Sequence, residues 1–301
     1  MEQIASLLIL QDASINYYAI DFIMMLGFMA ALRILAGSIA EVSLTDVLAT
    51  QDNFAVGISL AGAIVAVAVL MMGVVSGDAG GSYVDEISLM AGYGVLAMVL
   101  MWLTRKVFDH ISLPGVSIHQ EIMKGNVAAG LVDAGNMIAT AIIVRAAMTW
   151  VDGTTLTGLA MVVAAYVASQ IILVLATLYR KKVFEARHQG KRTLGGELAD
   201  GNTALAVRFA GYRLGVGLAV TATSGVVTYD PALLPLSMAV WCMVAVVMFV
   251  AQSTLSIALR LVLLPGIDIG KEVGEQRNVA VGAIEAAIYI GVGFAFVGLL
   301  G

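Results

Sequence analysis

The stretch Asn53-Phe-Ala55-Val-Gly57 opens a long apolar run, and close variants of it open three more apolar runs along the chain. The other copies are Asn126-Val-Ala128-Ala-Gly130, Asn202-Thr-Ala204-Leu-Ala206 and Asn278-Val-Ala280-Val-Gly282. The four asparagines lie 73, 76 and 76 residues apart. A period of this size indicates an internal repeat, so we expect four copies of one unit.

The composition is typical of a polytopic membrane protein. Hydrophobic residues make up 60% of the 301 residues, charged residues only 12%, and the mean hydropathy is +0.95. A helix needs about 20 apolar residues to cross the hydrocarbon core of a membrane. Eight spans are predicted: Ser14–Arg33, Phe54–Val75, Val84–Arg105, Asn126–Met148, Thr157–Tyr179, Asn202–Val227, Leu236–Arg260 and Asn278–Leu300. Residues 1–11 are expected to form a short interfacial helix, and their acidic start predicts no cleaved signal peptide.

A second, longer period divides the chain into halves. The stretches Leu113-Pro-Gly and Leu264-Pro-Gly lie 151 residues apart. We therefore expect an all-α fold of two pseudo-symmetric four-helix halves, residues 1–150 and 151–301. Because each unit has an even number of spans, the repeats are parallel and should be related by an axis along the membrane normal. This plan permits a ring of repeats.

The basic residues predict the orientation. Lysine and arginine are concentrated in the linkers 104–125, 179–201 and 260–277, whereas the short connections on the other side contain none. By the positive-inside rule the linkers face the cytoplasm, and both termini face outward. The first span of each unit ends in a base, taken as Arg33, Lys106, Lys182 and Arg260. The basic linkers are expected to contact anionic lipid headgroups, and nucleic acid is not an expected partner.

The four repeat asparagines, Asn53, Asn126, Asn202 and Asn278, permit two interpretations. Each can be an N-cap, whose side chain accepts a hydrogen bond from a free backbone N–H at the cytoplasmic start of a helix. Alternatively, the four amides form a ring at one membrane depth and line a mouth or hold a headgroup.

Charged residues inside the spans are the other candidate site. Asp133 and Glu285 each follow their repeat asparagine by seven residues, nearly two helical turns, and Arg208, Arg213 and Asp21 also lie within spans. Such groups usually face the bundle interior in pairs. Either they are structural ion pairs, or they line a pore or a proton path. The sharper expectation is that Asp133 and Glu285 pair equivalently with Arg208 and Arg213.

Other kinds of site are not expected. The single cysteine, Cys242, excludes an internal disulfide and is expected to act as a small hydrophobic residue. His110, His119 and His188 fall in linkers without metal-ligand spacing. No Walker sequence or catalytic triad is found, so we predict no cofactor and no enzymatic activity.

The stretches 52–62 and 201–211 resemble the YjfL-like bacterial inner-membrane family, whose module is domain of unknown function 350. The fourth copy departs from the pattern, because Ala287 stands where the other copies have Gly62, Gly135 and Gly211. The resemblance implies a multi-pass protein of the bacterial inner membrane built from two-helix modules, here in four copies. It also implies genes encoded near polyamine-linked ligases and envelope-stress proteins, but no established activity.

Two hypotheses for the function follow. The first is a channel or carrier for a small cationic solute or ion, such as a polyamine, because the embedded acids recur in both halves. The second is a non-transporting membrane scaffold that recruits cytoplasmic partners through its linkers. A water-filled path past Asp133 and Glu285 favours the first, and a fully paired interior favours the second. Small residues such as those of the GxxxG stretch at Gly211–Gly215 also permit a homo-oligomer.

Overall fold

The computed structural model describes residues 12–40, 43–76, 81–151 and 156–301, and within these ranges the chain is helical. Eight of the described helices are long and apolar enough to cross a membrane, as predicted. They are α2 (Asp12–Ala40), α4 (Phe54–Val75), α5 (Tyr83–Val107), α7 (Val127–Trp150), α8 (Leu156–Arg187), α10 (Thr203–Thr221), α12 (Leu234–Leu263) and α13 (Val279–Leu300). The interfacial helix predicted for residues 1–11 lies outside the described ranges.

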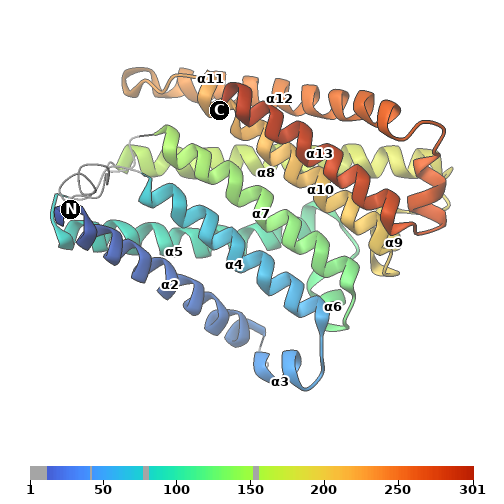
Figure 1. Cartoon of the computed structure of the whole chain (residues 1–301), viewed down its shortest axis with the longest axis horizontal. Helices are drawn as coiled ribbons and strands as arrows, with labels where there is room; N and C mark the ends of the chain where they lie inside the picture. Colours follow the sequence, from blue (N-terminus) through green and yellow to red (C-terminus); the bar gives the residue numbers. More distant parts are fainter. Residues whose placement is uncertain (1–11, 41–42, 77–80, 152–155) are drawn as a thin grey trace, which may run out of the picture.

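Short helices precede the four repeat asparagines, and all of them lie at one end of the molecule (Figure 1), which we call the linker end. They are α3 (Leu44–Ala49), α6 (Ile118–Met123), α9 (Leu194–Ala199) and the π-helical turn η3 (Gly270–Glu275). A second π-helical turn, η1 (Phe108–Ser112), continues α5. At the opposite end lie α11 (Thr223–Val226), η2 (Pro231–Leu233) and the C-terminus of the chain.

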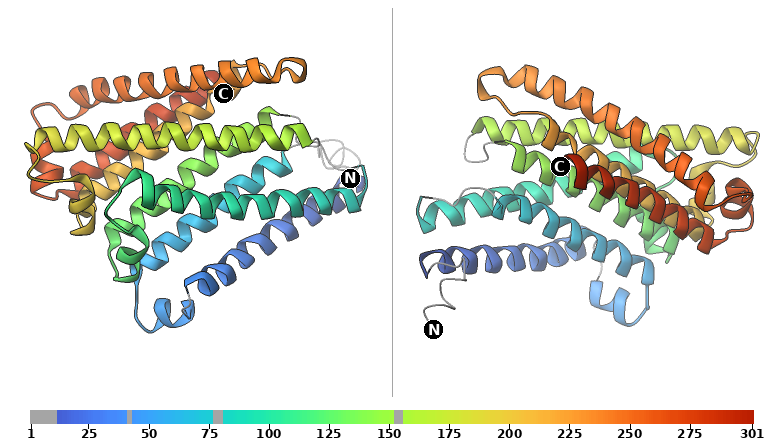
Figure 2. Two further views of the ribbon diagram at one scale, coloured as in Figure 1. Left: turned by 180° about the vertical axis from the view of Figure 1, so that it is seen from behind. Right: turned by 45° about the horizontal axis from the view of Figure 1, so that its top comes forward.

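The spans form two layers. The second helices of the repeats, α4, α7, α10 and α13, pack side by side in a row in that order (Figure 1). The first helices pack against this row from behind (Figure 2): α5 contacts α4 and α7, α8 contacts α7 and α10, and α12 contacts α10 and α13. Helices α4 and α13 lie at opposite ends of the row, so the described repeats form an open row instead of the ring that the sequence permitted.

Glycine residues allow neighbouring helices of the row to pack closely. At each joint between neighbouring helices, a glycine of one helix lies against an alanine of the next, and a Cβ on that glycine would stand only 2.3–2.7 Å from the alanine Cβ. The pairs are Gly62 with Ala134, Gly135 with Ala210, and Gly211 with Ala286. Small residues permit this approach, which drives helix packing in membranes. The fourth copy has Ala287 instead, and Ala287 is exposed because no helix follows α13 in the row.

Candidate functional site

Each repeat asparagine is the N-cap of the span that follows it, which confirms the capping role in the first interpretation. The Oδ1 atoms accept hydrogen bonds at 3.0–3.3 Å from the backbone N–H groups of Val56, Ala129, Leu205 and Val281. The preceding residue has a positive φ in all four repeats: 48° at Asp52, 86° at Gly125, 76° at Gly201 and 55° at Arg277. The geometry is therefore shared, although only two of the repeats use glycine, the residue for which this conformation is least strained.

The asparagines also form hydrogen bonds that connect each repeat to the next, which we call latches. The Nδ2 groups donate to backbone carbonyls at the end of the following repeat's short helix: Asn53 to Met123 at 3.1 Å, Asn126 to Leu198 at 2.9 Å, and Asn202 to Val273 at 3.1 Å. Asn278, in the last repeat, donates to the Glu272 carboxylate at 2.8 Å instead. The amides are occupied at the joints and form a row, not a ring around a mouth.

In the first half, Asp133 lies in a closed cluster with Ser59 and Arg105 (the first-half cluster). The Ser59 hydroxyl donates to Asp133 Oδ2 at 2.5 Å, and Arg105 donates to both carboxylate oxygens, at 3.0 and 3.3 Å. Arg105 also donates to Ser59 Oγ at 2.9 Å. Asp133 is 3% exposed. Every member of the cluster has a partner of opposite charge or a hydrogen-bonding partner.

The predicted pairing of Asp133 with Arg208 or Arg213 is therefore wrong. The reason is the order of the row. The side chain six residues after a repeat asparagine faces the next helix of the row, and the side chain seven residues after it faces the previous helix. Asp133 therefore faces α4, whereas Arg208 faces α13. Depth in the membrane, which the sequence does indicate, does not determine which neighbour a side chain faces.

In the second half, Glu285 lies in the equivalent cluster with Arg208 and Arg260 (the second-half cluster). Arg208 Nε is ion-paired with Glu285 Oε2, and Arg260 Nη1 lies 3.2 Å from Oε1. The carboxylate is 1% exposed and both arginine side chains are 14% exposed. The predicted Glu285–Arg208 pair is confirmed. Arg208 occupies the position that Ser59 occupies in the first half.

Arg213 lies apart from both clusters, where α10 meets α7 and α8. It is 1% exposed and donates to Thr177 Oγ1 at 2.6 Å, to the Leu173 carbonyl at 3.2 Å and to Asn136 Oδ1. Five residues after Arg208, it points about 140° away around the helix. The expected carboxylate partner is absent from its described contacts, and neutral oxygens take its place.

Asp21 lies in a fourth place, at the contact between α2 and α5. It is 7% exposed and lies beside Glu86, which is 4% exposed. The described contacts connect it with none of the other predicted charges. The residues predicted as one network thus divide among four separate places.

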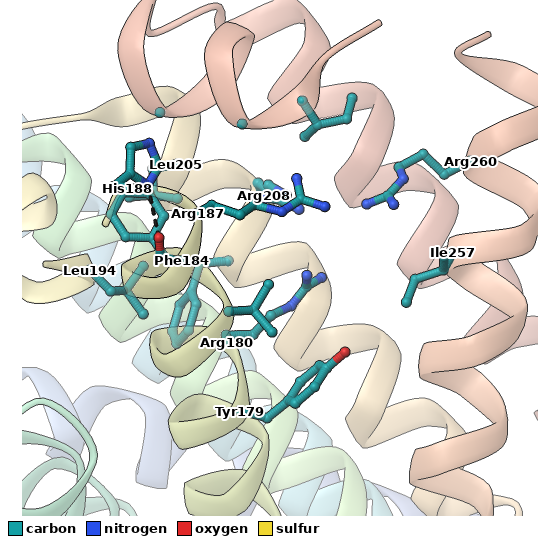
Figure 3. A pocket seen from close by; sticks show the side chains of 15 residues that line it. Tyr179, Arg180, Phe184, Arg187, His188, Leu194, Leu205, Arg208, Ile257 and Arg260 are labelled. Atoms are coloured by element: carbon teal, nitrogen blue, oxygen red, sulfur yellow. Dashed lines mark hydrogen bonds between the residues drawn. The ribbon is translucent and has the colours of Figure 1, made fainter. Parts of the chain in front are cut away.

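Above the second-half cluster, at the linker end, a cavity of about 100 Å³ opens between α8, α10, α12 and η3. We call it the basic pocket. The side chains of Arg180, Arg208 and Arg260 converge on it from three different helices (Figure 3). Arg187 and His188 line its rim. Apolar side chains complete the wall: Val183, Phe184, Leu194, Leu205, Phe209, Ile257 and Ile269.

Arg180 is predicted by the sequence only as part of the basic linker 179–201, and not as a neighbour of Arg208 and Arg260. Its guanidinium lies 4.0 Å from the ring centre of Tyr212 and 4.7 Å from that of Tyr289. Cations are attracted to the faces of aromatic rings, so the two tyrosines fix the direction of this side chain. The sequence predicted Lys182 as the base that ends this span. The signal that could have identified Arg180 is the shared place of Arg105 and Arg180, about 21 residues before an asparagine.

The charge of the pocket is unbalanced. Four arginines line it, and no carboxylate does so among the described residues. Glu285 neutralises one of these charges from below, and Asp268 lies at the edge, where its Oδ1 accepts from the Gly270 N–H at 2.9 Å. Guanidinium groups bind carboxylates and phosphates through paired hydrogen bonds. The arrangement can therefore hold a small anion. In the described part of the chain, no three His, Cys, Asp or Glu side chains gather as a metal site would require.

Two stretches of the chain, residues 6–148 and 153–300, match the family model described as Domain of Unknown Function (DUF350). Each match covers two successive repeats, so the family's unit corresponds to a four-helix half and occurs twice, where the resemblance had implied four two-helix modules. No curated protein and no solved structure matches the chain.

Proposed function

We propose that this chain, which belongs to the DUF350 family, is a non-transporting membrane protein that binds an anionic, phosphate-like group in the basic pocket of its second half. One observation carries the proposal: three guanidinium groups from α8, α10 and α12 converge on a cavity whose described wall holds no carboxylate. The proposal includes no catalytic step.

The charges around Glu285 favour an anion. Arg208 and Arg260 share this single carboxylate, and Arg180 contacts the faces of two tyrosine rings. Half-buried positive charges that outnumber their carboxylate partners are costly in an apolar environment. A bound oxyanion would compensate them, and the apolar wall would fit the glycerol or acyl part of a lipid whose headgroup carries the phosphate.

The clusters argue against the cation channel or carrier. A cation pathway needs acids that can exchange partners with a passing ion. Asp133 is instead held by Ser59 and Arg105, and Glu285 by two arginines. An approaching cation would have to displace an arginine at each point. The paired interior supports the second hypothesis, in which the protein acts through its linkers.

The proposed place of this protein is a bacterial inner membrane, with the pocket and the linkers facing the cytoplasm. In this arrangement an anion in the pocket contacts η3 and the end of α8, the segments that a cytoplasmic partner protein could reach. Cysteines introduced at Asp152 and Gly190, in a Cys242→Ala background, would test the orientation. An impermeant maleimide added from outside should label position 152 and spare position 190; the reverse pattern would overturn it.

Binding can be tested on the purified protein in a neutral detergent, with inorganic pyrophosphate titrated calorimetrically and retention of phosphatidylglycerol over phosphatidylcholine measured by native mass spectrometry. Arg180→Gln should weaken binding about 10- to 100-fold, the value of one charge-assisted hydrogen bond. Arg33→Gln, at the corresponding place in the first repeat but exposed, is the control.

The outcomes separate the sources of the phosphate. Pyrophosphate binding that depends on Arg180 indicates a soluble oxyanion, and Arg180-dependent retention of phosphatidylglycerol alone indicates a lipid headgroup. Equal behaviour of Arg180→Gln and Arg33→Gln with both probes would overturn the proposal. In parallel, liposomes should show no flux of potassium or spermidine, and a flux above that of empty liposomes would restore the transport hypothesis.

A further inference from the structure

The three joints of the row are built from the same contacts. The asparagine of one repeat donates to the linker carbonyls of the next, and a glycine lies against an alanine near mid-helix. A second glycine–alanine contact lies nearer the linker end at the first and third joints, between Gly130 and Ala55 and between Gly282 and Ala204. Each joint therefore has a leading half, on the earlier repeat, and a trailing half, on the later one.

Helix α13 carries a leading half that none of the described residues covers. The described donor bond of Asn278 goes to Glu272 of its own repeat. Ala280 occupies the position at which Ala55 and Ala204 receive a glycine, yet Ala280 is exposed whereas Ala55 and Ala204 are 0% exposed. Ala287 is exposed too. The last repeat thus carries the residues that form a joint, but no described helix packs against them.

Helices α3 and α4 carry the complementary trailing half. Gly57 stands where Gly130 and Gly282 stand, and a Cβ there would meet only Leu48, at an ordinary distance of 3.7 Å. Ala61 stands where Ala134 stands and is exposed. Ala49 and Thr50, which correspond to the latched ends of the later linkers, are exposed as well.

Helix α2 lacks a neighbour in the same way. The first helices of later repeats pack in the groove between two helices of the row. For α2 no described helix forms the earlier side of that groove, and only 6% of its spanning segment is buried, against 39% for α5 and 50% for α8. A helix placed beside α4 would complete this groove too.

We propose that the missing neighbour is a second copy of this chain, docked head to tail, with α13 of one copy against α3 and α4 of the next. Asn278 would then reach the carbonyls of Ala49 and Thr50 of the next copy, and Ala280 would lie against its Gly57. Such an interface joins two different surfaces and generates a ring or a line of copies. Ala287 meets Ala61 where internal joints have a glycine, so this joint is looser than the internal ones.

Cysteine cross-linking in native membranes tests this arrangement in a Cys242→Ala background. Chains with Gly57→Cys and chains with Ala280→Cys, expressed together and oxidised, should form a covalent dimer, whereas neither variant should do so alone. A chain carrying both cysteines should give a ladder of oligomers. Val247→Cys, on an exposed face of α12 (58%), replaces Ala280→Cys as the control. Self-cross-linking of Ala280→Cys, or a yield no higher than the control, would overturn the proposal.

Ala287 gives a second, independent measurement. Ala287→Gly should raise the cross-linked fraction several-fold at a fixed protein-to-lipid ratio, because it recreates the glycine of the internal joints. Ala287→Leu should reduce that fraction to the control level and leave the thermal stability of the monomer unchanged, since the side chain is exposed. Ala239, an exposed alanine of α12, receives the same two substitutions as controls. Equal effects at Ala239 and Ala287 would contradict the head-to-tail joint.

Discussion

The first-half and second-half clusters occupy equivalent places in the fold but differ in net charge. In the first half, Arg105 and the Ser59 hydroxyl hold the Asp133 carboxylate, and the charges balance. In the second half the position of Ser59 is taken by Arg208, so two arginines share one carboxylate. The backbone arrangement is shared, and the charge of one side chain separates a neutral cluster from an anion-binding candidate.

The surroundings increase this difference. Asp109 and His119 line the small pocket above the first-half cluster, whereas Arg180, Arg187 and His188 line the basic pocket. A duplicated half can therefore keep its packing while its polar positions diverge. The comparison indicates that the halves differ in their polar side chains near the linker end, while they share the glycine–alanine packing of the row.

The largest expected effect is on stability, upon removal of the shared carboxylate. Glu285→Gln leaves two buried arginines without a partner and should lower the free energy of unfolding by about 3–5 kcal/mol. Asp133→Asn should cost less, because the Arg105 side chain is 37% exposed and can turn toward water. Thermal unfolding in detergent measures both. Adding Arg208→Ser to Glu285→Gln should recover part of the loss, and equal losses in the two halves would remove the proposed contrast.

The next largest effect is on anion binding, when Arg208 is replaced by serine, the residue at the equivalent position of the first half. Arg208→Ser should weaken pyrophosphate or phosphatidylglycerol binding about 10- to 100-fold. The fold should survive, because Arg260 still pairs with Glu285 as Arg105 pairs with Asp133. Calorimetric titration beside a thermal scan distinguishes the two quantities. If binding persists, Arg208 is a structural partner of Glu285 only.

A smaller effect tests whether the packing is common to the halves. Gly62→Ala and Gly211→Ala each place a Cβ about as close to the facing alanine, at 2.4 and 2.3 Å. Each should destabilise the protein by about 1–3 kcal/mol through overpacking, and by similar amounts. Thermal unfolding checks this, with Gly92→Ala, which meets no atom within 4 Å, as the control. A large difference between the first two would mean that the joints are not equivalent.

The smallest effect concerns a linker carboxylate. Lys124 donates to Glu121 at 2.7 Å and, with Asn126, lowers the pKa of that carboxyl below its ordinary value. Because the pKa is lowered in the folded state, the pair stabilises the protein at neutral pH and the contribution is lost as the pH falls through that pKa. Lys124→Ala should therefore cost less than about 1 kcal/mol at pH 7, and the cost should shrink as the pH falls through the lowered pKa of Glu121. A loss independent of pH would show that Lys124 acts otherwise.

The sequence predicted what periodicity determines. The spacing of the asparagines gave four repeats, their residue type gave the N-caps, and apolar length gave the eight spans. The errors concern which helices and side chains lie next to each other. The position of Asp133 along its helix follows from the sequence, but its partner depends on which helix stands before α7 in the row, and no local pattern states that order. Arg180 was missed because its direction depends on two tyrosines from other helices.

The asparagine latches have a consequence for synthesis. In every latch the donor precedes its acceptors by about 70 residues: Asn53 requires Ile122 and Met123, and Asn202 requires Val273. The chain emerges from the ribosome N-terminus first. The asparagine of the last completed repeat therefore lacks its carbonyl acceptors until the following repeat has been made. We therefore expect the repeats to assemble in order from the N-terminus, and a chain interrupted after any repeat would end in an asparagine that lacks its carbonyl acceptors.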